Sequence, residues 1–211
     1  MRTAARTVYL IVISSIVWIS AADAYDFLSW IKARLSSEEV PFLESTSDTF
    51  RVDVVAEGLE SPWAVVPTSR NRLLITERPG RLRVVEHGRL LPESVPGVPR
   101  VAYQGQGGLL DIALHPDYAT NRMIYLAYTV ETDRGLMTRV TRFEETAQGL
   151  KNPLVIFPGV PGSHKAKHFG CRIRFGIDRK LYITLGERGE GWRAQDLMDL
   201  NGKTLRLNDD G

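Results

Sequence analysis

The stretch Arg72-Leu73-Leu74-Ile75-Thr76 decides the fold, because similar stretches occur twice more along the chain. They are Arg122-Met123-Ile124-Tyr125-Leu126 and Arg179-Lys180-Leu181-Tyr182-Ile183-Thr184. Each follows a short apolar segment and a polar turn, and successive copies start 50 (122 − 72) and 57 (179 − 122) residues apart. A strand–turn–strand unit that recurs at about 40–50 residues or slightly more is typical of the blades of a β-propeller.

Short β-rich segments separated by Gly, Pro, Asn and Asp continue on both sides of these repeats. Many short strands with turn signals between them predict an all-β sandwich, barrel or propeller, and no long segment of helical period competes. The repeat favours the propeller, with a complete sandwich as the alternative. The expected strands are Phe50–Val55, Ala64–Val66, Leu73–Thr76, Leu82–Val85, Leu109–Leu114, Met123–Tyr128, Arg139–Phe143, Leu154–Phe157, Ile173–Phe175, Leu181–Leu185 and Lys203–Leu207.

The number of repeats predicts an incomplete ring. One blade cannot bury both of its faces alone, and about 4–8 blades normally close a propeller. The three repeats therefore indicate about three blades over residues 49–211, in a chain that is truncated relative to a closed ring.

Composition excludes several classes of protein. The chain has 211 residues, of which 43% are hydrophobic, an ordinary balance for a globular domain. Its 27 basic and 25 acidic residues give a net charge of +2, with no basic block that would favour nucleic acid. Cys171 is the only cysteine, which excludes an intrachain disulfide and a zinc site built from several thiolates.

The first residues are typical of a secretory signal. Arg2 and Arg6 precede the apolar run Val8–Ser20, and Ala22-Asp23-Ala24 supplies small residues for cleavage. The run is shorter than the roughly 20 residues that span a bilayer. Residues 1–24 are therefore expected to be a signal peptide and 25–48 a linker with a short helix. The protein would be periplasmic or secreted, without a stable membrane span after cleavage; an N-terminal membrane anchor is the alternative.

Six phrases occur in an order and at spacings that resemble one family, the soluble quinoprotein (PQQ-dependent) aldose/glucose/sorbosone dehydrogenases. They cover nearly all of residues 49–211. The phrases are Gly58–Ala64, Thr76–Leu82, Gly105–Asp111 running on to His115–Tyr118, His168–Arg172, Leu185–Gly189, and Ala194–Leu197 followed by Gly202–Gly211.

This resemblance implies a six-bladed propeller with pyrroloquinoline quinone (PQQ) in the mouth of the ring. Members of the family oxidise the anomeric carbon of an aldose to a lactone, with hydride transfer to the quinone. The expected partners are an aldose and an electron acceptor. Whether the chain forms a homodimer is left undecided by the resemblance. The family's calcium ligands and most of its cofactor-anchoring groups belong to later blades, so they are expected beyond Gly211. The chain itself is accordingly expected to be poorly active.

The resemblance also assigns roles to four residues. His168 occupies the position of the catalytic base, and histidine suits this role because its pKa lies near neutrality. Gln106, in the Gly-rich turn Gly105–Gly108, would contact substrate, although such a turn also forms for purely structural reasons. Arg172 and Arg188 are expected to bind the cofactor, with bracing of the fold as the alternative for both.

Some positions depart from the family pattern. Lys167 stands where some members have an acid that could orient the histidine, and a neighbouring cation disfavours a protonated imidazole. Cys171 replaces a small residue and is interpreted as a buried apolar group. His164 and His168 have the i, i+4 spacing of a zinc pair, but the glycines around them argue against the helix this requires. No metal site is expected within the chain.

Two other functions remain open. A propeller that keeps the fold without catalysis would serve as a binding or interaction module. A calcium-dependent propeller hydrolase acting on lactones would need clustered acids at the channel, and the sequence shows no such set.

Overall fold

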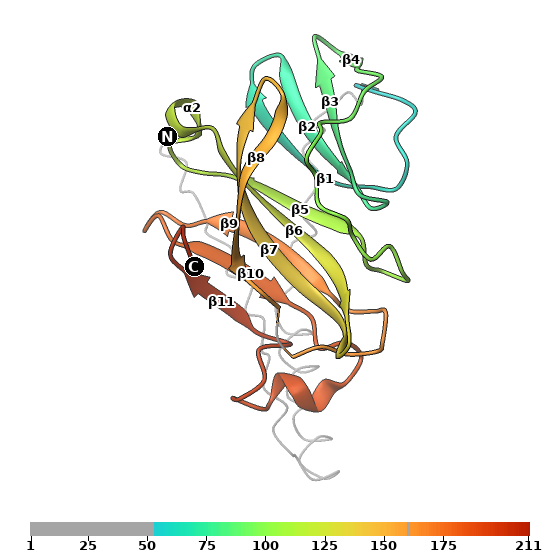
Figure 1. The fold of residues 1–211 in the computed structure, drawn as a ribbon, viewed down its shortest axis with the longest axis vertical. Coiled ribbons are helices and arrows are strands. Elements are labelled where there is room, and N and C mark those ends of the chain that lie inside the picture. Colours follow the sequence, from blue (N-terminus) through green and yellow to red (C-terminus); the bar gives the residue numbers. More distant parts are fainter. Residues whose placement is uncertain (1–52, 160) are drawn as a thin grey trace, which may run out of the picture. The chain divides into compact units, whose positions relative to one another are not determined.

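The computed structural model describes residues 53–159 and 161–211, which form three antiparallel sheets (Figure 1). The first sheet consists of β1 (Pro62–Ser69), β2 (Arg72–Glu77), β3 (Arg81–Glu86) and β4 (Arg89–Leu90). The second consists of β5 (Leu109–Leu114), β6 (Met123–Thr132), β7 (Gly135–Thr146) and β8 (Gly149–Phe157). The third consists of β9 (Gly170–Phe175), β10 (Leu181–Leu185) and β11 (Thr204–Leu207). The predicted signal peptide and linker lie outside the described residues.

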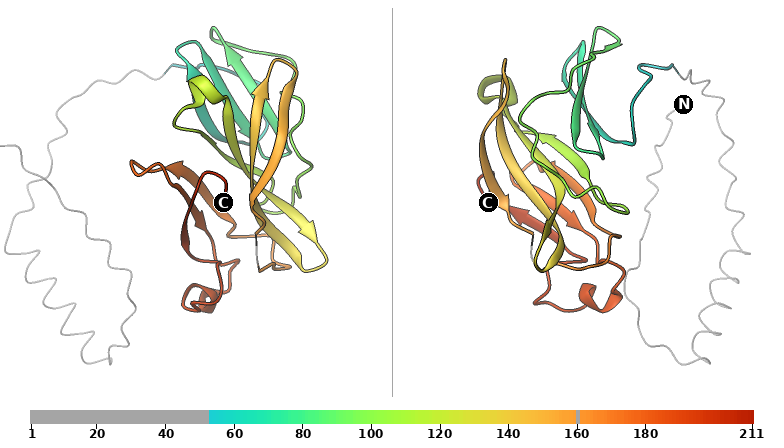
Figure 2. Two further views of the ribbon diagram at one scale, coloured as in Figure 1. Left: turned by 60° about the vertical axis from the view of Figure 1, so that its left-hand side comes forward. Right: turned by 45° about the vertical axis from the view of Figure 1, so that its right-hand side comes forward.

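The three repeated stretches form the second strand of each sheet, β2, β6 and β10. The apolar segments before them form the first strands, β1, β5 and β9. These first strands are neighbours in space, since β1 contacts β5 and β5 contacts β9 (Figure 2). Sheets that pack face to face with their first strands adjacent are propeller blades, which confirms the expected all-β propeller with about three blades.

The second sheet is buried on both faces, and this explains the unbroken apolar run of β6. Ile124 and Leu126 belong to the core shared with the first sheet, whereas Tyr125 and Ala127 belong to the core shared with the third. Successive side chains of a strand point to opposite faces, so only a blade between two neighbours needs apolar residues at consecutive positions.

The structure differs from the expected strands in a few places. Residues 53–55, expected to continue a strand, are not in one, and Val54 and Val55 are exposed. A strand needs a partner for its backbone hydrogen bonds, and none of the described sheets includes residues 53–55. The short β4, a helical turn α2 (Tyr118–Asn121) and a 3-10 turn η1 (Gly191–Ala194) were not expected.

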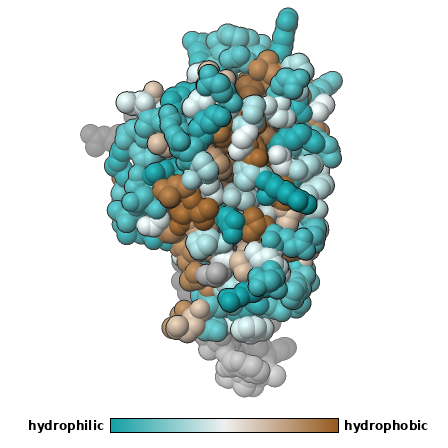
Figure 3. Space-filling model, viewed as in Figure 1, coloured by the Kyte–Doolittle hydropathy of each residue, from teal (hydrophilic) through white to brown (hydrophobic). Residues whose placement is uncertain are grey.

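Polar side chains cover most of the face drawn in Figure 3, with apolar groups between them. The most exposed of the large apolar residues are Ile177, Leu197 and Met198. None of the helical segments in the described part of the chain is long and apolar enough to cross a bilayer.

Candidate active site around His168

The loop that leads into β9 brings two predicted site residues together. The backbone N–H of His168 donates a 2.8 Å hydrogen bond to Oε1 of Gln106, 62 residues earlier in the chain. The backbone N–H of Gln106 in turn donates to the carbonyl of Ala166, at 2.9 Å. The Gly-rich turn and the histidine loop are therefore fixed to one another. The His168 side chain stays 47% exposed, which leaves it accessible to a ligand.

His168 also has a carboxylate partner. Its Nδ1 lies 2.5 Å from Oε1 of Glu187, just after the end of β10, and the same oxygen accepts the backbone N–H of Gly189 at 3.0 Å. The hydrogen bond from His168 is the main reason that the pKa of Glu187 lies below its usual value. A proton on Nδ1 satisfies this contact and leaves the lone pair of Nε2 free to accept another proton.

This partner was not predicted from the sequence. The position expected to orient the histidine was the one directly before it, where Lys167 stands, and no catalytic role was predicted for Glu187. Lys167 is exposed, and its side chain lies against Gly189, whose backbone N–H donates to Glu187. A signal was present, because a Glu-Arg pair stands at the end of the second strand of the first sheet (Glu77-Arg78) and another stands shortly after the second strand of the third (Glu187-Arg188).

Arg188 lies inside the protein beneath the histidine loop. Its Nη1 donates to the carbonyl of His168 and its Nη2 to Oγ1 of Thr138, both at 2.8 Å. The guanidinium centre is 4.4 Å from the ring centroid of Phe169. Burial lowers the pKa of Arg188 to about 10, so the group still carries its charge at neutral pH. Arg188 is only 1% exposed and supports the backbone of His168. It would therefore contribute to cofactor binding only by holding that loop in place.

Arg172, by contrast, has a guanidinium that a ligand can reach. Its side chain is 55% exposed, and Nη1 lies 3.4 Å from Oδ1 of the buried Asp111. The guanidinium centre is 5.7 Å from the ring of Trp63. Nε and Nη2 have no hydrogen-bond partner among the described residues, so they could receive one carboxylate of a tricarboxylic quinone.

Asp111 joins the second blade to the third. Its Oδ2 accepts the backbone N–H of Ile173 at 2.8 Å and Nη1 of Arg174 at 3.0 Å, in addition to the contact with Arg172. The carboxylate is fully buried and belongs to β5, while all three donors belong to β9. It therefore fixes the strand that continues from the His168 loop.

The glycines of the Gly-rich turn are required by backbone packing. At Gly105 (φ +54°) a Cβ would lie 2.2 Å from the carbonyl oxygen of Ala166, and at Gly108 (φ +132°) 2.1 Å from that of Arg78. These glycines let the turn pack closely against neighbouring backbone. Their presence is therefore explained by packing, without a ligand. The same packing places Gln106 against the histidine loop.

Gly108→Ala should lower the free energy of unfolding by about 1–3 kcal/mol, because the new Cβ combines strained backbone with a clash. Gly191→Ala is the matched control, since φ there is not positive and nothing lies within 4 Å of its Cβ position. Urea unfolding followed by fluorescence compares the two variants. Equal midpoints would contradict the packing explanation.

The other sequence interpretations can also be placed. His164 and His168 lie in a non-helical loop, and the described residues contain no group of three or more His, Cys, Asp or Glu side chains that could hold a metal ion. Cys171 is fully buried between the second and third blades, and burial raises the pKa of its thiol.

Comparison with known proteins identifies the family. The profile of the Glucose / Sorbosone dehydrogenase family matches residues 59–211. Aldose sugar dehydrogenase YliI of Escherichia coli is 37% identical over 167 residues, which are 77% of this chain and 45% of that protein. The PQQ-bound aldose sugar dehydrogenase of Streptomyces coelicolor superposes with a TM-score of 0.68 at 36% identity, over 76% of this chain and 48% of that one. Hedgehog-interacting protein of Mus musculus is 30% identical over 181 residues, 75% of this chain and 26% of that protein.

The chain thus spans less than half the length of each of these relatives. Two of the three are named as sugar dehydrogenases, and one of these was solved with PQQ. The match extends over all three blades and includes the His168 loop and the end of β10. The chain belongs to the Glucose / Sorbosone dehydrogenase family.

Proposed function

We propose that this chain supplies the proton-accepting part of a PQQ-dependent dehydrogenase that oxidises an aldose at its anomeric carbon to a lactone. The observation that carries the proposal is the imidazole of His168, accessible to a ligand and held through Nδ1 by Glu187. A histidine in this arrangement can accept a proton at Nε2 while the carboxylate stabilises the imidazolium that forms.

The residues divide the work of the reaction. Nε2 of His168 takes the proton of the anomeric hydroxyl as the C1–H bond breaks and the C1–O bond becomes a carbonyl. Glu187 orients the ring and favours its charged form, and Arg188 holds the backbone of the loop. Gln106 uses its oxygen on His168, so its NH₂ group, which has no partner among the described residues, is free for a sugar oxygen. PQQ, when bound, would supply the acceptor for the hydride that leaves the sugar carbon.

Arg172 is the described residue that best fits the cofactor. PQQ carries three carboxylates, and a half-exposed guanidinium beside the His168 loop offers two parallel N–H groups to one of them. Asp111 and Trp63 restrict the positions that the guanidinium can adopt. We also propose export to the periplasm or beyond, on the basis of the signal-like residues 1–24.

A chimera tests the function, because the chain covers only part of its relatives. Residues 59–211 would replace the matching segment of the E. coli aldose sugar dehydrogenase, with the unmodified E. coli protein as positive control. We expect dye reduction that depends on an aldose, on PQQ and on calcium. Circular dichroism and a PQQ titration establish that the chimera folds and binds the cofactor. A folded chimera that binds PQQ and yet does not oxidise any aldose tested would contradict the proposal.

A non-catalytic interaction module is the second candidate, since one relative is named for an interaction. The PQQ titration of the same chimera separates the two functions. If the chimera is folded but the quinone does not bind, the interaction module is favoured. If PQQ binds and aldoses are oxidised, the enzyme is favoured.

A further inference from the structure

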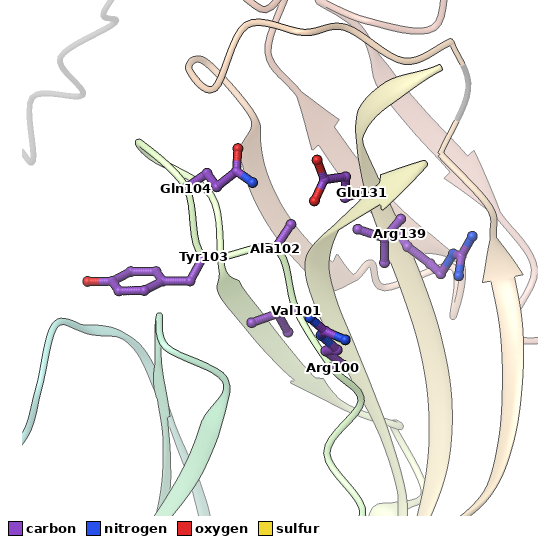
Figure 4. Close-up of a pocket in the computed structure, with 8 residues that line it drawn as sticks. Arg100, Val101, Ala102, Tyr103, Gln104, Glu131 and Arg139 are labelled. Atoms are coloured by element: carbon purple, nitrogen blue, oxygen red, sulfur yellow. The ribbon is translucent and has the colours of Figure 1, made fainter. Parts of the chain in front are cut away.

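A pocket lies next to the segment that precedes Gln106 in the chain. It has a volume of about 580 Å³ and is lined by residues 100–104 and by the adjacent ends of β6 and β7. Figure 4 shows the side chains of Gln104 and Glu131 turned toward one another across the hollow, whereas Tyr103 points away from it. Neither Gln106 nor His168 lines this pocket.

The charged groups of the pocket have no partners within residues 53–159 and 161–211. Arg139 is partly buried, and its Nε is completely buried without a hydrogen bond. Neither Arg139, Arg100 nor Glu131 forms an ion pair or a side-chain hydrogen bond with any described residue. A buried polar group without a partner costs about 1–3 kcal/mol, so such groups call for an explanation.

Several other partly buried arginines have carboxylate partners. Arg72 contacts Glu145 at 2.6 Å, and Arg193 contacts Asp199 at 3.3 Å. Arg83 lies 3.5 Å from Glu77. Buried nitrogens without a hydrogen bond also occur on Arg83, Arg188 and Arg193, but the guanidinium groups of those three have other acceptors. Arg139 has no side-chain acceptor among the described residues.

We propose that this pocket binds a small acidic sugar, that is, a polyol that carries one carboxylate or phosphate group. The exposed guanidinium of Arg100 supplies N–H donors for the anionic group, and the positive charge of Arg139, which also lines the pocket, attracts that group. The carboxylate of Glu131 accepts hydrogen bonds from hydroxyl groups, and the amide of Gln104 both donates and accepts them. Glu131 also disfavours ligands that are anionic throughout. The volume falls within the range of about 300–1,000 Å³ that is usual for small-molecule sites.

The pocket is coupled by the chain to the site described above. The backbone N–H of Ala102 donates to Thr129 on β6, and that of Gly107 donates to the carbonyl of Gln104 at 2.8 Å. Gln104 and Gln106 therefore belong to one short, internally bonded loop. A ligand held by Gln104 contacts the same loop that presents Gln106 to His168.

Isothermal titration of the 211-residue chain tests this assignment. Glucuronate and glucose 6-phosphate are the probes, and the comparison between them shows whether a carboxylate or a phosphate is preferred. Binding of at least one of them is expected. Arg100→Gln should weaken it at least about tenfold, the loss of a hydrogen bond to a charged group, and Arg139→Gln should also weaken it, through the loss of a positive charge that lines the pocket. Arg100 is exposed, so its variant does not depend on the tolerance of the core.

Arg70→Gln is the matched control, because Arg70 is an exposed arginine in the turn between β1 and β2, outside the pocket. It should leave the binding of the acidic sugar unchanged. The heat recorded with glucose should be the same for the original chain and for the two pocket variants. The proposal is overturned if neither acidic sugar binds, if the two pocket variants bind as well as the original chain, or if Arg70→Gln weakens binding equally.

Discussion

Replacing His168 by glutamine is expected to lower kcat/KM for aldose oxidation by about 10²–10⁴, the usual contribution of a general base. Glutamine keeps much of the size of the side chain but cannot accept the anomeric proton. The backbone contacts of position 168 with Gln106 and Arg188 can persist in the variant. The loss should therefore reflect chemistry and not the disruption of the loop. The measurement is steady-state dye reduction in the chimera with E. coli aldose sugar dehydrogenase.

His164→Gln is the control for this experiment. His164 is exposed in the same loop and has no hydrogen-bond or ion-pair partner among the described residues. Its replacement should leave kcat/KM essentially unchanged. Comparable losses in the two variants would show that the loop, and not the imidazole of His168, limits the reaction.

Asp111→Ala is expected to have the largest effect on stability, about 3–5 kcal/mol of the free energy of unfolding. The substitution removes a fully buried carboxylate and leaves the backbone N–H of Ile173 and the guanidinium of Arg174 without an acceptor. The donors all belong to β9, so the contact between the second and third blades should weaken first. Urea unfolding of the 211-residue chain measures the effect.

Asp117→Ala gives the matched comparison. Asp117 also pairs with an arginine, Arg179, which lies between β9 and β10. The side chain of Asp117, however, is 53% exposed. An exposed pair is screened by water, so the unfolding midpoint should change little. If the two aspartates give similar shifts, burial of Asp111 is not what makes its contacts important.

Much of this fold can be predicted from the sequence, because each repeated stretch forms the same strand of a blade. The repeat identified β6 from its sequence, and the packing of this blade between two others explains why apolar residues stand at consecutive positions in it. The expected bounds of β5 and β10 agree with the structure. The expected strand at 50–55 was wrong over residues 53–55, because β-propensity does not reveal whether a neighbouring strand is available.

The site was less predictable than the fold. The resemblance singled out His168 and Gln106, and the structure brings them together through a hydrogen bond. The carboxylate partner of His168 was missed because the pairing with Glu187 depends on how the end of β10 meets the start of β9. Similarly, Arg172 is exposed whereas Arg188 is buried. This difference depends on tertiary packing, which the sequence pattern does not reveal.

The central claim is that His168 accepts the proton when the sugar is oxidised. The most direct test loads the chimera with PQQ, mixes it with glucose and follows reduction of the bound quinone by absorbance. We predict that the His168→Gln variant binds PQQ as tightly as the original chimera but reduces it at least about 10²-fold more slowly. Reduction of the quinone at an unchanged rate in that variant would contradict the account.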